Sequence, residues 1–94
     1  MSEDEPYGVH VAEASAEHTH INWEPARPRV NLVRVRAHTC DCQPVFYELC
    51  QAAGLMFIRK VSRRGGKTVV HESAWQRTEV ACALWLQLLR GKAL

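Results

Sequence analysis

Lysine and arginine are absent from the first 26 positions of this 94-residue chain. All 12 basic residues occur from Arg27 onward, against four acidic residues there, so that part has a formal charge of +8 although the whole chain has +2. The first 26 positions contain six carboxylates: Glu3, Asp4, Glu5, Glu13, Glu17 and Glu24. This separation of charge predicts an acidic leader, residues 1–28, followed by a basic domain, residues 29–94.

Long hydrophobic runs are also lacking. The longest, Val80 to Leu86, is too short to span a bilayer, and the acidic start Met1–Glu5 has none of the apolar character of a signal peptide. We therefore expect a single cytoplasmic domain with no membrane partner. In that compartment the four cysteines are expected to be thiols or metal ligands rather than disulfides.

Motifs for catalysis are sparse. The four acidic residues of the basic domain are scattered, and Gly65-Gly66-Lys67-Thr68 lacks the earlier glycine and the following helix of a phosphate-binding loop. Cys–His nucleophilic chemistry is left open by spacing alone. We expect that the protein is not an enzyme.

The leader shows weak periodicity, and Pro25 and Pro28 separate it from the rest of the chain. We predict that it is flexible. The alternative is that Ile21 and Trp23 attach part of the leader to the basic domain.

Alternating apolar and β-branched residues, followed by one apolar helical run, indicate the fold class. The strand-like segments are VNLVRVRA (30–37), VFYELC (45–50), LMFIRKV (55–61) and TVVHE (68–72). A helix over 79–90 would have Thr78 as its N-cap and Gly91 as its C′ residue. We predict an α+β domain, an antiparallel β-meander of three to four strands packed by one C-terminal helix.

Alternation also predicts which residues share a face of the sheet. In the first segment Arg34 and Arg36 would lie on one face, with Val33, Val35 and Ala37 on the other. A four-residue loop at 51–54 would place Cys50 opposite Leu55. One face would then contain Val45, Tyr47, Leu49, Met56, Ile58 and Lys60, and the outer face would contain Phe46, Glu48, Leu55, Phe57 and Arg59. A three-residue loop would mix these faces, and the sequence leaves the register open.

The stretch HTCDCQPVFYELC, residues 38–50, contains three of the four cysteines. A zinc site needs four ligands, so Cys40 and Cys42 would need partners from His38, Cys50 and His71. The stretch resembles in part the zinc-binding SWIM module, which begins C-x-C but ends C-x-H, whereas Gln51 and Ala52 follow Cys50 here. We predict no metal and no cofactor, and leave open whether His38, Cys40 and Cys42 bind zinc.

Basic residues cluster around the predicted outer face and the turn RRGGK. Cationic side chains of this density are typical of surfaces that follow a phosphate backbone, and Phe46 or Phe57 could stack on bases. We predict a small nucleic-acid-binding, regulatory or accessory protein whose partner is DNA or RNA. The predicted contact residues are Arg34, Arg36, Arg59, Lys60, Arg63, Arg64, Lys67 and Arg77.

The layout of MFIRKVSRRGGKTVVHESAWQRTEVACALWLQLLRGK, a sheet followed by a helix, resembles the arm-binding domains of tyrosine integrases and the plant AP2 domain. That resemblance implies a sheet laid in the major groove of DNA. The block from Cys40 onward is also similar to short uncharacterised proteins of actinobacteria, which implies no activity.

The predicted helix raises an alternative. Its apolar residues extend over more than half of its circumference, wider than one sheet face requires. A homodimer or partner interface around Trp85 and Leu86 would cover the excess. Coverage of the helix by the leader is the other interpretation.

Overall fold

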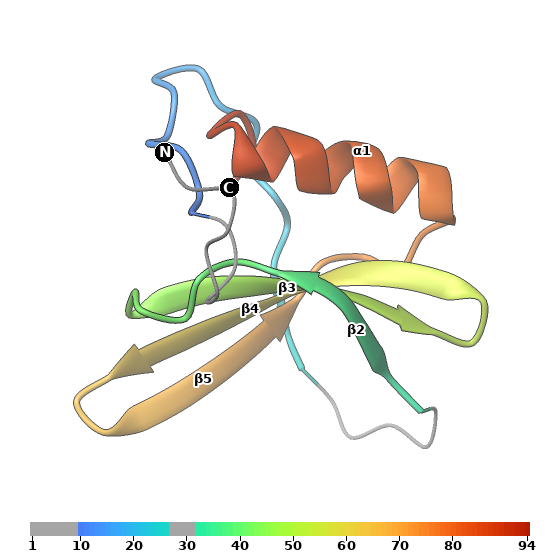
Figure 1. The fold of residues 1–94 in the computed structure, drawn as a ribbon, viewed down its shortest axis with the longest axis horizontal. Helices are drawn as coiled ribbons and strands as arrows, with labels where there is room; N and C mark the ends of the chain where they lie inside the picture. The colour runs from blue at the N-terminus through green and yellow to red at the C-terminus, as the bar shows by residue number, and fades with distance from the viewer. Residues whose placement is uncertain (1–9, 27–31) are drawn as a thin grey trace.

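The computed structural model describes residues 10–26 and 32–94. In these residues five antiparallel strands form one sheet in the order β1-β5-β4-β3-β2, and one helix lies over a face of it (Figure 1). The elements are β1 Glu24–Pro25, β2 Arg34–His38, β3 Val45–Ala52, β4 Leu55–Arg64, β5 Lys67–Glu72 and α1 Thr78–Leu89. The α+β class is confirmed. The expected number of strands, three to four, is wrong because the edge strand β1 is a fifth. None of the helices in the described ranges is long and apolar enough to cross a membrane.

The β3–β4 hairpin closes with a two-residue turn, Ala53-Gly54, and with neither the four-residue nor the three-residue loop that the sequence left open. Ala52 pairs with Leu55 and Cys50 pairs with Phe57. Both turn residues have positive φ, 53° and 75°, as a type I′ hairpin turn requires. Because this register differs by two residues from that of a four-residue loop, every residue of β3 and β4 lies on the face that such a loop would give it.

The main core lies between α1 and the sheet. Alternate residues of β3 and β4 meet helix residues spaced four and three apart, the spacing of one helix face. Ile58 and Leu88 at the centre of this core are fully buried. The buried members of the cluster are Tyr47, Leu49, Met56, Ile58, Ala81, Trp85 and Leu88.

A second, smaller cluster covers part of the opposite face. It consists of Cys50, Ala52 and Phe57, packed by Val33 and Trp75. The Trp75 ring, from the segment between β5 and α1, stacks on Phe57 at 4.6 Å with an interplanar angle of 1°. Phe57 is only 1% exposed as a result, so this face is not an open aromatic surface.

A β-bulge in β2 changes the predicted faces of that strand. Val35 pairs with Cys50 while Ala37 pairs with Leu49, so the register shifts between them at Arg36. Val35 and Ala37 therefore lie on opposite faces, and the prediction that they share one is wrong. The extra residue, Arg36, donates its Nε–H to Gln51 Oε1 at 2.6 Å.

The ends of α1 agree with the sequence in part. The residue before the helix is Arg77, in an extended conformation and without a side-chain cap bond, so Thr78 is the first helical residue and not the N-cap. Gly91 has a φ of 73°, as expected for the C′ position.

Residues 12–21 lie along the C-terminal end of α1 and the chain that follows it (Figure 1). The backbone N–H groups of this segment donate to carbonyl oxygens there at 2.7–2.9 Å: Ala12 to Leu89, Ser15 to Gly91, Thr19 to Lys92 and Ile21 to Leu94. Ile21 and Trp23 pack against the main core. This placement corresponds to the alternative in which those two residues attach the leader, while the boundary at residue 28 and Glu3, Asp4 and Glu5 lie outside the described residues.

The segment then becomes β1, which pairs with β5 through Glu24–Glu72 and Pro25–His71. Proline is tolerated here because β1 is an edge strand and needs no donor on its outer side.

Candidate functional site

The turn between β4 and β5 presents three exposed cations, Arg63, Arg64 and Lys67, which we call the basic hairpin end. Gly65 and Gly66 close the turn with φ values of 56° and 77°, the conformation of a type I′ turn. The turn lies away from α1 in Figure 1. Apart from its chain neighbours, no described residue has an atom within 4 Å of a Cβ built at either glycine, so among residues 10–26 and 32–94 nothing covers the backbone of the turn.

Like charges lie directly opposite each other at this end. Arg64 pairs with Lys67, and Arg63 pairs with Thr68. Because neighbouring residues of a strand point to opposite faces, Arg64 and Lys67 share one face while Arg63 lies on the other. Like charges at a direct cross-strand position destabilise a sheet, and a bound anion would offset that repulsion.

Arg63 also supports the turn before β3. Its guanidinium lies over the Phe46 ring, 5.0 Å from the centroid, and donates to the carbonyl oxygens of Asp41 and Gln43. Part of its donor capacity is therefore used within the protein, whereas no such contact occupies Arg64 or Lys67 among the described residues.

The structure does not bring the eight predicted contact residues into one surface. Arg59 forms an ion pair with Glu48 at 3.3 Å, and Lys60 lies over the Trp23 ring on the helix-facing side. Arg34 pairs with Gln51, which in turn pairs with Met56. Arg34 therefore lies near the start of β4, at the opposite end of that strand from the basic hairpin end. Arg36 is at the bulge and Arg77 precedes α1, both exposed.

The aromatic residues predicted to stack on bases are not equivalent. Phe57 is covered by Trp75, whose Nε1–H donates to Glu72 Oε1 at 3.3 Å. Phe46 is half-buried beneath Arg63. Stacking of bases on Phe57 would require Trp75 to leave, so a stacking platform is not preformed on this face.

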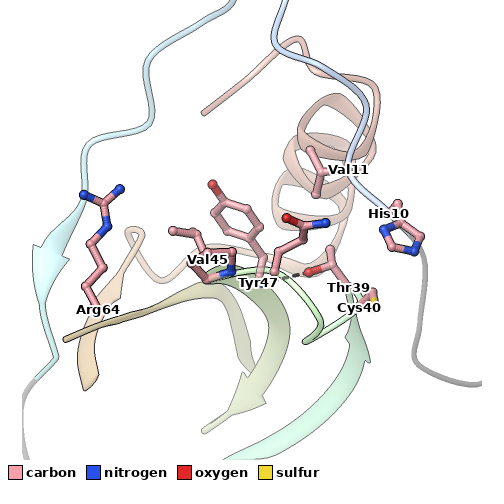
Figure 2. Close-up of a pocket in the computed structure, with 9 residues that line it drawn as sticks. His10, Val11, Thr39, Cys40, Val45, Tyr47 and Arg64 are labelled. Carbon is pink, nitrogen blue, oxygen red and sulfur yellow. Dashed lines mark hydrogen bonds between the residues drawn. The ribbon is translucent and has the colours of Figure 1, made fainter. Parts of the chain in front are cut away.

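A cleft of about 370 Å³ extends from the basic hairpin end to the leader. In Figure 2, Arg64 lies at one end, His10 at the other, and Tyr47 points into the space between them. Burial raises the pKa of Tyr47, so its hydroxyl stays protonated at neutral pH. The cleft therefore combines a cation, a neutral phenol and part of a group of potential metal ligands.

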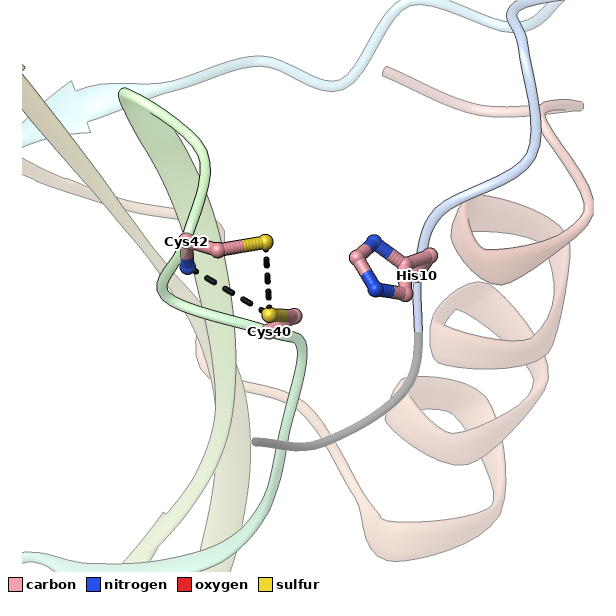
Figure 3. A group of neighbouring side chains, drawn as sticks. All are labelled: His10, Cys40 and Cys42. Atoms are coloured by element: carbon pink, nitrogen blue, oxygen red, sulfur yellow. Dashed lines mark hydrogen bonds between the residues drawn. The ribbon is translucent and has the colours of Figure 1, made fainter. Parts of the chain in front are cut away.

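That group consists of His10, Cys40 and Cys42, which we call the thiol–imidazole group (Figure 3). Cys40 follows β2 and is buried, while Cys42 is exposed in the turn before β3. The two Sγ atoms are 2.7 Å apart, and the backbone N–H of Cys42 donates to Cys40 Sγ at 3.4 Å. The hydrogen bond with Cys40 raises the pKa of Cys42.

The three ligands proposed from sequence as partners of the cysteine pair are not in this group. His38 is paired with Glu48, and its Nδ1 is 3.0 Å from the carbonyl oxygen of Thr39. Cys50 is fully buried in the second cluster, and His71 pairs with Lys60 on β4. The sequence analysis missed His10 because this residue lies far before Cys40 and Cys42 in the chain, and no spacing pattern connects it with the two cysteines.

The predicted helix interface is divided by the packing. Trp85 is 6% exposed and belongs to the main core, so it is not available to a partner. Leu86 is 49% exposed and Val80 40% exposed. A partner at α1 would therefore meet these two residues and not Trp85.

Comparison with known protein families, curated proteins and solved structures finds no match to this chain.

Proposed function

We propose that this protein binds nucleic acid through the basic hairpin end, as a small regulatory or accessory protein without catalytic activity. The observation that carries the proposal is the direct pairing of Arg64 with Lys67, both exposed, at the end of a hairpin closed by two glycines. Cations so placed can contact neighbouring phosphates, and contact with phosphate releases bound counterions.

Duplex DNA is the target that fits this end best. The major groove of B-DNA admits a two-stranded β-ribbon, whereas the major groove of A-form RNA is too narrow for side chains to read. The resemblance in layout to integrase arm-binding and AP2 domains supports the same mode. The covered position of Phe57 argues against a stacking platform for single strands. We include in this proposal that the protein acts in the cytoplasm.

The test is a binding titration of full-length protein against duplex DNA, duplex RNA and single-stranded probes at several salt concentrations. The sharpest variant is Arg64→Glu/Lys67→Glu, because reversal of Arg63 would also remove its bonds to the 41–44 turn. Arg90→Glu/Lys92→Glu is the matched control, with the same change in net charge at exposed positions near the C-terminus.

We expect the hairpin variant to weaken DNA binding by roughly tenfold or more and to lower the slope of log K against log salt by about two, since about 0.9 counterions are released per phosphate contact. The control should keep most of the affinity. Absence of salt-dependent binding to every probe, or equal losses in the two variants, would refute the proposal.

A second copy of the chain meeting α1 is the other candidate. The exposure of two large apolar side chains of α1, Val80 and Leu86, favours it. Sedimentation of wild type and Leu86→Ser decides: a dimer that Leu86→Ser dissociates supports an interface, and a monomer at all concentrations excludes it. The Arg64→Glu/Lys67→Glu variant should leave such a dimer intact.

A further inference from the structure

We propose that His10, Cys40 and Cys42 bind one zinc ion, which ties the leader to the turn between β2 and β3. This inference is independent of nucleic-acid binding and differs from the sequence-based expectation of no metal. It rests on the three side chains that the fold brings together: their nitrogen and sulfur ligand atoms all lie within 4.8 Å of one another.

The distances are close to those of a zinc site. With Zn–S bonds of about 2.3 Å and Zn–N bonds of about 2.1 Å, a tetrahedral ion holds its ligand atoms about 3.6–3.8 Å apart. The sulfur atoms at 2.7 Å would separate by about 1 Å, and the imidazole would approach by a similar amount. Figure 3 shows the ring of His10 turned toward both sulfur atoms. These shifts are of the size that side-chain rotation gives, and none of the three residues belongs to a strand.

Two N–H donors of the β2–β3 turn lie beside the sulfur atoms of the pair. The N–H of Cys42 donates to Cys40 Sγ at 3.4 Å, and the side-chain amide of Gln43 donates to Cys42 Sγ at 3.9 Å. Such donors orient metal-bound sulfur atoms and offset their negative charge. On binding, each thiol releases its proton to solvent, and neutral His10 contributes a ring-nitrogen lone pair.

The fold also holds His10 near the pair. Two residues further on, the N–H of Ala12 donates to the carbonyl oxygen of Leu89 at 2.9 Å, and Ser15 N–H donates to that of Gly91 at 2.7 Å. These bonds attach the leader to the end of α1. The ion would add a second attachment, to the β2–β3 turn.

The donor set selects the class of metal. Two thiolates and one imidazole suit Zn²⁺, while Ca²⁺ and Mg²⁺ prefer oxygen ligands. Three protein ligands leave one tetrahedral position for water or another donor, as at zinc sites that keep an open position. His10 and Cys40 also line the cleft that reaches Arg64, so an anion in the cleft is a candidate for that position.

The experiment uses the full chain, reduced and freed of metal with a chelator, and titrates it with Zn²⁺ in competition with a chromophoric chelator. Wild type should bind one equivalent. Cys40→Ser and Cys42→Ser should each remove this binding, and His10→Ala should weaken it on the order of tenfold or more, since it removes one of three ligands. His38→Ala is the matched control, a histidine near the pair but outside the group, and should bind as wild type does.

Two further readouts separate a site from a folding defect. Zinc should raise the thermal midpoint of wild type and His38→Ala but not of Cys40→Ser, and it should slow amide exchange at Ala12 and Ser15. Co²⁺ in place of zinc should give the absorption of a tetrahedral ion with two thiolates. A wild-type protein that binds no zinc, or a folded His10→Ala variant that binds it as tightly as wild type, would overturn the proposal.

Discussion

Gly91→Ala tests whether the leader rests on the end of α1. Gly91 has a φ of +73°, and a Cβ built there lies 2.2 Å from the carbonyl oxygen of Glu13 and 2.9 Å from its carbonyl carbon. Side chains do not tolerate such distances to backbone atoms. The substitution therefore forces the leader away from Gly91, the end of α1 to move, or both.

Two costs add up. A left-handed conformation costs a non-glycine residue about 1–2 kcal/mol. Displacement of the leader breaks the bonds from Ser15 N–H to Gly91 and from Ala12 N–H to Leu89, each with a net contribution of about 0.5–1.5 kcal/mol. We expect Gly91→Ala to lower the free energy of unfolding by about 2–5 kcal/mol.

Gly66→Ala is the matched control because its φ is +77°, but in the part of the chain that the structure describes only its chain neighbours come within 4 Å of the added Cβ. It should incur only the conformational cost of about 1–2 kcal/mol. Urea unfolding of the two variants measures the difference, and amide exchange at Ala12 and Ser15 shows whether the leader has moved. Equal destabilisation by the two substitutions, with exchange unchanged, would refute the docking of the leader on Gly91.

Two other predictions follow from buried groups. Ser73→Ala should destabilise the protein by about 1–3 kcal/mol in urea unfolding, because the buried Ile58 N–H loses its acceptor Ser73 Oγ at 2.9 Å. Ser62→Ala, at a half-buried position of β4, should change stability by less than about 0.5 kcal/mol, and equal losses would contradict the reasoning. Burial raises the pKa of Cys50 to about 11 from 9.0. Because folding favours the neutral thiol, its contribution to the free energy of unfolding is present below pH 9 and is lost as the pH rises through about 11. In metal-free protein at mildly alkaline pH, mass spectrometry after alkylation should find Cys42 modified and Cys50 intact, and equal rates of modification would show that Cys50 is not protected.

Strands β2 to β5, the helix and the faces of β3 and β4 were predictable because their signals are local. Alternation placed Tyr47, Leu49, Met56 and Ile58 on the helix-facing side, and the two-residue difference in hairpin register left that placement unchanged. Gly91 was identified as the C′ residue because positive φ is a property of one residue and its neighbours. The basic hairpin end could also be predicted, because its charged residues and glycines are adjacent in the sequence.

Features that depend on distant partners were decided by the tertiary structure. Strand β1 exists because the edge of β5 offers hydrogen bonds to an unpatterned segment, and the bulge at Arg36 appears only when β2 pairs with β3. Trp75 covers Phe57 after the chain turns between β5 and α1. His10 joins Cys40 and Cys42 only because the leader is attached to the end of α1. Composition and periodicity therefore determined β2 to β5, α1 and the apolar faces of β3 and β4. Packing between segments far apart in the chain determined the edge strand, the bulge and which polar and thiol groups became neighbours.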